Sequence, residues 1–401
     1  MSQSTTPSPQ DHPGLIFVIF LRLGLTAFGG PIAHLEYFRR EFVERRGWLS
    51  VQAYGDLVAL CQFLPGPASS QTGIGLGLMR GGLRGAFAAW LGFTLPSALA
   101  MTAFALLLTH VGGLAQGGWL HGLKLVAVAV VAQALWGMGR SLCPDRERAS
   151  LAVAAAVLAA LAPGVTGQLA VIALGAVAGR WLLRAPPQAV HEALRAPLSR
   201  RAAVVLLAIF GLLLIGLPAL AAALHQPALA LFSGFYQSGA LVFGGGHVVL
   251  PLLQAQVVPA GMDNSTFLAG YGAAQAVPGP LFTFAAFLGA AAHNGPGGWL
   301  GAGVALVGIF LPGFLLVTGA LPLWAGLRRH PAMRSALMGI NAAVVGLLLA
   351  AFYNPVWTTA IHTPRDFALA VAALLLLQVW KVPPWAVVLL GAGVAGVLAV
   401  A

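Results

Sequence analysis

The sequence predicts an all-α polytopic membrane protein built from two inverted-topology repeats, with helices broken or re-entrant at Pro-Gly-Pro turns. The first reason is composition: hydrophobic residues fill 59% of the 401 positions and charged residues only 8%, whereas soluble domains carry about 25% charged residues. The second is length, because apolar runs of the roughly 20 residues that cross a bilayer recur along the chain. The third is a repeated motif. Gln-x-x-Pro-Gly-Pro occurs at residues 62–67 and again, 213 positions later, at residues 275–280.

The chain divides into four parts. Residues 1–13 are polar and lack the basic start of a signal peptide, so we expect a short disordered tail. Residues 14–183 are predicted to form the first transporter repeat and residues 228–401 the second. The linker between them, residues 184–227, combines a proline pair and several arginines with an extra hydrophobic segment. We expect about ten to thirteen membrane segments in all.

The second repeat replays the order of the first. Four features recur in sequence at offsets of 213 to 217 residues, which indicates a tandem duplication. The matched features are Phe28-Gly29-Gly30-Pro31 with Phe243-Gly244-Gly245-Gly246, Pro65-Gly66-Pro67 with Pro278-Gly279-Pro280, Gly85 and Pro96 with Gly301 and Pro312, and Lys124 with Asn341.

Loop charges predict that the two repeats point in opposite directions. The first repeat carries Arg39, Arg40, Arg45, Arg46, Arg80 and Arg84 in loops whose counterparts, residues 254–265 and 293–298, have no lysine or arginine. Further along the chain the difference in basic residues reverses. Residues 111–118 contain no lysine or arginine, while their counterpart carries Arg328, Arg329 and Arg334. The positive-inside rule therefore favours inverted repeats. A simple count of crossings favours parallel repeats, and we give more weight to the charges.

Each Pro-Gly-Pro turn is expected to line a cavity, because irregular backbone at membrane depth must be covered by protein or water. The helix that follows a turn presents free N–H groups, which suit an oxyanion. The alternative is that nearby hydroxyl groups only cap their own helices. The predicted substrate-binding residues at the turns are Gln62, Pro65, Gly66, Pro67, Ser69, Ser70, Gln275, Pro278, Gly279, Pro280 and Thr283.

Charged and titratable residues within apolar sequence are the other candidates. Arg22 and Lys124 are predicted to supply positive charge to an anion, since intramembrane cations usually face a cavity or a partner. Snorkelling to an interface is the alternative for both. His34, Glu36 and Asp56 are candidates for proton coupling. The alternatives are an interfacial turn for His34 and Glu36, and a helix-start charge for Asp56.

The absence of known motifs argues against an ATP-driven pump and against the commonest metal-dependent intramembrane enzymes. The sequence contains no zinc-protease, nucleophile-elbow or phosphate-loop motif, so we expect no catalytic residue, metal or cofactor. Cys61 and Cys143 are far apart and form no disulfide framework. The net charge of +11 follows from topology-setting loops, so it does not indicate nucleic acid.

Residues 21–31 followed by His34, then Trp48-Leu49, then residues 61–67, resemble the chromate ion transporter family in its long, two-domain form. Residues 243–251 and 272–280 resemble that family's second domain. The resemblance implies a bacterial inner-membrane protein that exports chromate, an oxyanion similar to sulfate, and confers resistance. It also implies a role in binding for Gly29, Gly30, Pro31, Gly244 and Gly245, in addition to Arg22 and the two Pro-Gly-Pro turns.

The sequence thus predicts a secondary transporter of chromate, driven by the membrane potential or a proton gradient. Two alternatives stay open: transport of sulfate or another small anion, and an intramembrane enzyme acting on a lipid-linked substrate. The expected partners are the anion and the lipid bilayer, and a homodimer is left open.

Overall fold

The computed structural model describes residues 11–110, 117–184, 194, 197–324 and 330–400, and all regular structure in these ranges is helical. Among the described residues, helix α8 (Arg200–Leu224) separates the two halves of the chain. The first half contains α1 (Pro13–Thr26), α2 (Gly30–Phe38), the π-helix η1 (Arg39–Arg45), α3 (Val51–Phe63), α4 (Ala68–His110), α5 (Gly118–Leu142), α6 (Arg146–Leu161) and α7 (Val165–Leu182). The second half contains α9 (Pro227–Ala240), η3 (Gly246–Val248), α10 (Val249–Val257), α11 (Asn264–Ala274), η4 (Leu281–Thr283), α12 (Phe284–Ala290), α13 (Gly298–Ala320), η5 (Leu321–Leu323), α15 (Pro331–Ala351), η6 (Phe352–Trp357), α16 (Thr358–Ala360), α17 (Pro364–Gln378) and α18 (Pro384–Val400).

Short helices meet at glycine-rich turns in both halves. Gly29 (φ +103°) and Gly66 (φ +124°) lie at the turns that follow α1 and α3, and Gly244 (φ +76°) and Gly279 (φ +97°) lie at those that follow α9 and α11. Only glycine adopts these left-handed conformations without a Cβ penalty. We refer to the four turns together as the central turns: residues 27–30, 64–67, 241–245 and 275–280.

Within the described residues, six helices are long and apolar enough to cross a membrane. The shorter apolar helices are Pro13–Thr26, Leu281–Ala290 and Pro384–Leu398. This is fewer than the roughly ten to thirteen segments that apolar length predicts, because several helices have fewer than 18 residues. Helices α1 and α12 are short next to the central turns, and α6, α17 and α18 are short elsewhere. The chain is therefore a multi-pass membrane protein with many short helices.

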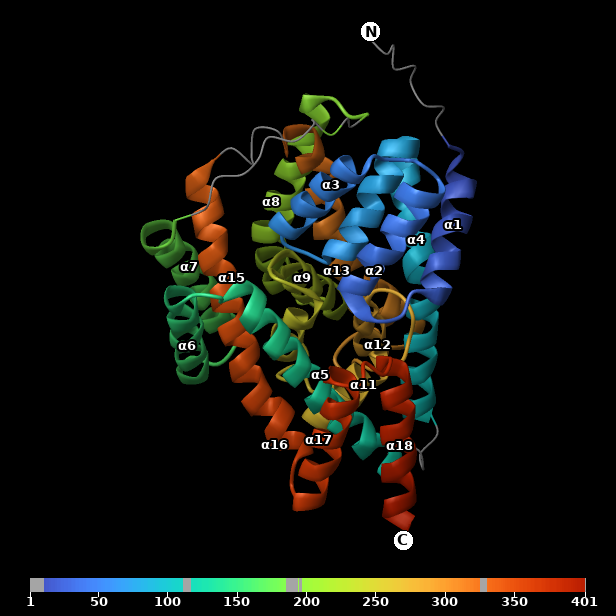
Figure 1. Ribbon diagram of the computed structural model, residues 1–401, viewed down its shortest axis with the longest axis vertical. Helices are drawn as coiled ribbons and strands as arrows, with labels where there is room; N and C mark the ends of the chain where they lie inside the picture. The colour runs from blue at the N-terminus through green and yellow to red at the C-terminus, as the bar shows by residue number, and fades with distance from the viewer. Residues whose placement is uncertain (1–10, 111–116, 185–193, 195–196, 325–329, 401) are drawn as a thin grey trace.

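The last two helices of each half pack against a helix of the other half. Helix α5 of the first half packs against α17 and α18, and α15 of the second half packs against α6 and α7 (Figure 1). Both contacts are backbone to backbone: a Cβ on Gly122 would lie 2.3 Å from the carbonyl oxygen of Gly391, and one on Gly339 would lie 2.0 Å from that of Gly175. Small residues allow such close helix packing in membranes. The duplicated halves are thus intertwined rather than set side by side.

Candidate functional site

The central turns are joined by two equivalent hydrogen bonds between the halves. The N–H of Gly66 donates to the carbonyl of Val242 at 2.7 Å, and the N–H of Gly279 donates to the carbonyl of Ala27 at 2.9 Å. Each Pro-Gly-Pro turn of one half therefore binds the Gly-Gly turn of the other half. These contacts bring together segments more than 170 residues apart in the sequence.

Each Pro-Gly-Pro turn also rests on a long helix of the opposite half. A Cβ on Gly279 would lie 2.8 Å from the Ser97 hydroxyl of α4, and one on Gly66 would lie 3.4 Å from the Cα of Gly313 in α13. Gln71 supports the first turn, because its Nε2 donates to the carbonyl of Pro65 at 2.8 Å. Turns fixed from several sides provide a rigid place for a site.

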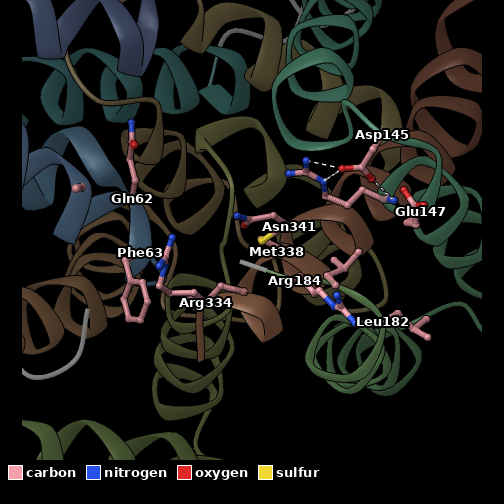
Figure 2. A pocket seen from close by; sticks show the side chains of 13 residues that line it. Gln62, Phe63, Asp145, Glu147, Leu182, Arg184, Arg334, Met338 and Asn341 are labelled. Atoms are coloured by element: carbon pink, nitrogen blue, oxygen red, sulfur yellow. Dashed lines mark hydrogen bonds and ion pairs between the residues drawn. The ribbon is translucent and has the colours of Figure 1, made fainter. Parts of the chain in front are cut away.

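A cavity of about 660 Å³ opens beside the central turns (Figure 2). Its walls come from both halves: the end of α3, the start of α6, the end of α7 and the first turns of α15. It is lined by Ala59, Gln62, Phe63, Asp145, Glu147, Arg148, Leu182, Leu183, Arg184, Arg334, Leu337, Met338 and Asn341. A space of this size is within the range of small-molecule sites.

Three arginines and two acids line this cavity. Arg148 donates from Nε to Asp145 at 2.7 Å, and Asp145 also caps α6 by accepting from the Arg148 backbone N–H at 2.9 Å. These bonds from Arg148 hold the pKa of Asp145 below its usual range. Arg184 has no ion-pair partner among the described residues. The lining therefore carries a net positive charge, which favours an anion.

Asn341 connects the cavity to the central turns. Its Oδ1 is buried without a hydrogen-bond partner in the described part of the chain, and lies 3.5 Å from the position of a Cβ on Gly244. Gly244 follows Val242, whose carbonyl binds Gly66. Buried polar groups are usually satisfied, so an unpaired one is a place for a water or a ligand.

The turn-associated candidates lie in four kinds of surroundings. Gln62 lines the cavity, whereas Thr283 donates to the carbonyl of Pro280 at 2.8 Å and so caps its own turn. The Ser70 hydroxyl and the Gln275 amide nitrogen are buried and lack partners among the described residues. The remaining candidates form or adjoin the turns themselves, namely Gly29, Gly30, Pro31, Pro65, Gly66, Pro67, Gly244, Gly245, Pro278, Gly279 and Pro280.

The structure does not bring the two predicted cations to this cavity. Arg22 is exposed on α1, and Lys124 of α5 donates to the Ser265 hydroxyl at 3.0 Å. Neither residue lines the cavity. Their roles in anion binding stay predictions.

The proton-coupling candidates lie in different surroundings. His34 is buried; its Nε2 donates to the carbonyl of Ala27 at 3.2 Å, while Nδ1 lies 3.4 Å from the Ser69 hydroxyl. Glu36 accepts hydrogen bonds from Arg39 and Arg40, both at 2.9 Å. Asp56 is buried in α3. His34 is the candidate nearest the central turns, since Ala27 O also accepts from Gly279.

Sequence reasoning missed Arg148 and Arg184 and counted Arg334 only as a loop charge. All three lie at helix ends, where basic residues ordinarily serve topology. The sequence did offer one sign of this cavity. Asn341 is the repeat counterpart of Lys124, so a polar residue occupies this position of an apolar helix in both halves.

Comparison with known proteins identifies the family. The chromate transporter family profile matches residues 14–180 and 229–397. The chain is 31% identical to a chromate transport protein of Pseudomonas aeruginosa over 97% of this chain and 93% of the relative. It is 27% identical to a chromate transport protein of Cupriavidus metallidurans, covering 96% and 92%, and 26% identical to an uncharacterized transporter of Methanocaldococcus jannaschii, covering 84% and 82%. No solved structure matches the chain significantly. This protein therefore belongs to the chromate transporter family, and it is a transporter rather than an enzyme.

Proposed function

We propose that this protein exports chromate, or a closely similar tetrahedral oxyanion, across a bacterial inner membrane and so confers chromate resistance. One observation carries the proposal: a chain similar over its full length to chromate transport proteins has an arginine-lined cavity next to its central turns. The driving force is the membrane potential or a proton gradient. An inside-negative potential moves anions outward, with about 2.3 kcal/mol per charge per 100 mV.

The cavity has the chemistry that a dianion requires. Removing an oxyanion from water is costly unless charges and hydrogen bonds replace its hydration. Guanidinium groups of Arg184 and Arg334 offer paired N–H donors that match tetrahedral oxyanions. The amides of Gln62 and Asn341 add uncharged donors near the turns. Sulfate has the same shape and charge, so it is the main competing substrate.

We infer that the two halves have inverted topology with re-entrant hairpins at the central turns. Helix α1 has 14 residues and spans about 21 Å, which is less than the roughly 30 Å of a bilayer core. Counting α1 and α2 as one re-entrant hairpin removes a crossing. With α8 crossing once, the second half then begins on the opposite side from the first, in agreement with the loop charges.

This topology supports the direction of transport. The cavity has Arg148, Arg184 and Arg334 in its lining, and positively charged segments face the cytoplasm. The cavity would therefore open inward and receive its anion from the cytoplasm.

Radioactive chromate uptake into inverted membrane vesicles tests the proposal. We expect uptake above that of empty vesicles, loss when the potential is collapsed, and competition by excess sulfate. Arg184→Gln should reduce uptake strongly, whereas the control Arg146→Gln should not, because Arg146 is exposed on α6 outside the cavity lining. No uptake above empty vesicles would reject chromate export.

A further inference from the structure

We propose that a second, closed half of the anion path lies on the other side of the central turns, between α5, α11 and the start of α17. Its closing contacts are His121 with Asp366 and Lys124 with Ser265. This inference rests on the proposed function, since it completes the path that the open cavity begins.

The repeat assigns each wall of the open cavity a counterpart. Met338 and Asn341 flank Gly339, which packs on Gly175, just as His121 and Lys124 flank Gly122, which packs on Gly391. Helix α17 of the second half is the counterpart of α6, because the two helices begin with equivalent N-cap hydrogen bonds. The N-cap of α6, Asp145, accepts from the N–H of Arg148, and the N-cap of α17, Thr363, accepts from the N–H of Asp366. Gln275 is the counterpart of the cavity residue Gln62.

The counterpart region is closed by polar contacts. His121 Nε2 of α5 donates to Asp366 Oδ1 of α17 at 2.6 Å. The other oxygen of Asp366 only caps its own helix, accepting from the N–H of Thr363 at 2.9 Å. Lys124 Nζ donates to the Ser265 hydroxyl at 3.0 Å. At the matching positions of the open cavity, Arg148 binds its own helix cap, Asp145, and both Arg148 and Met338 line the cavity.

The polarity of these residues indicates a path rather than simple packing. Asp366 is 8% exposed, and buried charges are costly unless paired. Its Oδ2 belongs to the capping box of α17, whereas its Oδ1 is paired across helices with His121. The Gln275 amide nitrogen is buried without a partner in the described residues. Lys124 takes the place of Asn341, and would meet the anion on this side. The other titratable groups nearby are Asp263, which caps α11, and His362, whose ring stacks 6.5 Å from that of His121.

It follows that the two halves of the path open in turn. Separation of His121 from Asp366 would open the closed half of the anion path. The equivalent approach of Met338 to Arg148 would close the cytoplasmic cavity. Because the open cavity is proposed to face the cytoplasm, the closed half faces outward.

Thiol labelling tests this without any substrate. In a chain with Cys61→Ala and Cys143→Ser, Gln275→Cys is exposed to a membrane-impermeant maleimide outside intact cells, with and without Asp366→Asn. We expect Asp366→Asn to raise labelling at least about fivefold, the lower end of typical coupling between states. The control Gln62→Cys should lose labelling from the cytoplasmic side. Equal labelling of Gln275→Cys in both backgrounds would overturn the proposal.

Crosslinking provides the second measurement if Asp366→Asn fails to fold. A short, reducible bifunctional thiol reagent should link His121→Cys to His362→Cys, whose parent rings lie 6.5 Å apart, and stop chromate uptake until reductant is added. This pair leaves Asp366 in place. The control pair Asp11→Cys and Arg80→Cys replaces an ion pair of 2.9 Å away from the path, and its crosslinking should leave uptake unchanged. Continued uptake after complete crosslinking of the first pair rejects the gate. Absence of chromate uptake in the protein without any introduced cysteine would instead reject the proposed function.

Discussion

The carbonyl of Val242 accepts a hydrogen bond from the N–H of Gly66, which fastens a turn of the second half to a turn of the first. The equivalent bond joins Ala27 to Gly279. Two matched bonds of this kind place the duplicated turns at the centre of the molecule, next to the arginine-lined cavity. Perturbing either turn should therefore affect transport through both halves.

Gly279→Ala should impair both stability and transport. Gly279 has φ +97°, and its new Cβ would lie 2.8 Å from the Ser97 hydroxyl. The left-handed conformation alone costs about 1–2 kcal/mol for a residue with a Cβ. A lower melting temperature of the purified protein, with reduced chromate uptake, would agree with this expectation. Gly393→Ala is the control, because nothing lies within 4 Å of its Cβ position; an equal loss there would contradict it.

Asn341→Asp should weaken chromate transport, whereas Asn341→Lys should retain it. Opposite charges at the same position separate electrostatics from shape, since a charge 4 Å away is worth about 4 kcal/mol at an effective dielectric of 20. We expect at least about a tenfold loss in the ratio kcat/KM for the aspartate variant, which corresponds to about 1.4 kcal/mol. Kinetics of uptake in inverted vesicles measure it. Similar kinetics for both variants would place the anion elsewhere.

Glu36 should stay ionised throughout the physiological range. Hydrogen bonds from Arg39 and then Arg40 lower its pKa to about 2. A carboxyl group with a depressed folded pKa contributes stability above its unfolded pKa and loses it only as the pH falls toward 2. We therefore expect the pH profile of transport between about pH 5 and 8 to be the same in Glu36→Gln as in the parent. A profile that changes shape in this variant would support a role for Glu36 in proton coupling.

Gly339→Val should destabilise the protein more than any substitution on an open helix face. Its Cβ would meet the Gly175 carbonyl oxygen at 2.0 Å, and overpacking costs typically 1–3 kcal/mol, occasionally more. Gly303→Val is the matched control, because Gly303 is also helical and no atom lies within 4 Å of its Cβ position. Thermal stability of the two detergent-purified variants provides the comparison. Equal stability would argue against close packing of α7 on α15.

Local chemistry explains how much could be predicted from the sequence. A membrane protein follows from apolar composition, and the duplicated order of motifs follows from counting positions. The ends of α3 and α11 follow from the Pro-Gly-Pro segments, because proline cannot continue a helix and glycine adopts positive φ. Family membership, expected from motifs such as residues 61–67, is shown by the full-length matches.

The sequence alone determined that this chain is helical, duplicated and made for a bilayer, since these properties depend on residue type and spacing. Only the tertiary structure decided that Gly66 meets Val242, that α5 and α15 pack on the other half's final helices, and that Arg148, Arg184 and Arg334 share one cavity. The reason is physical. Contacts between residues far apart in the chain depend on how whole helices pack, and the pattern along a single helix shows only which residues can approach closely, not which partner they approach.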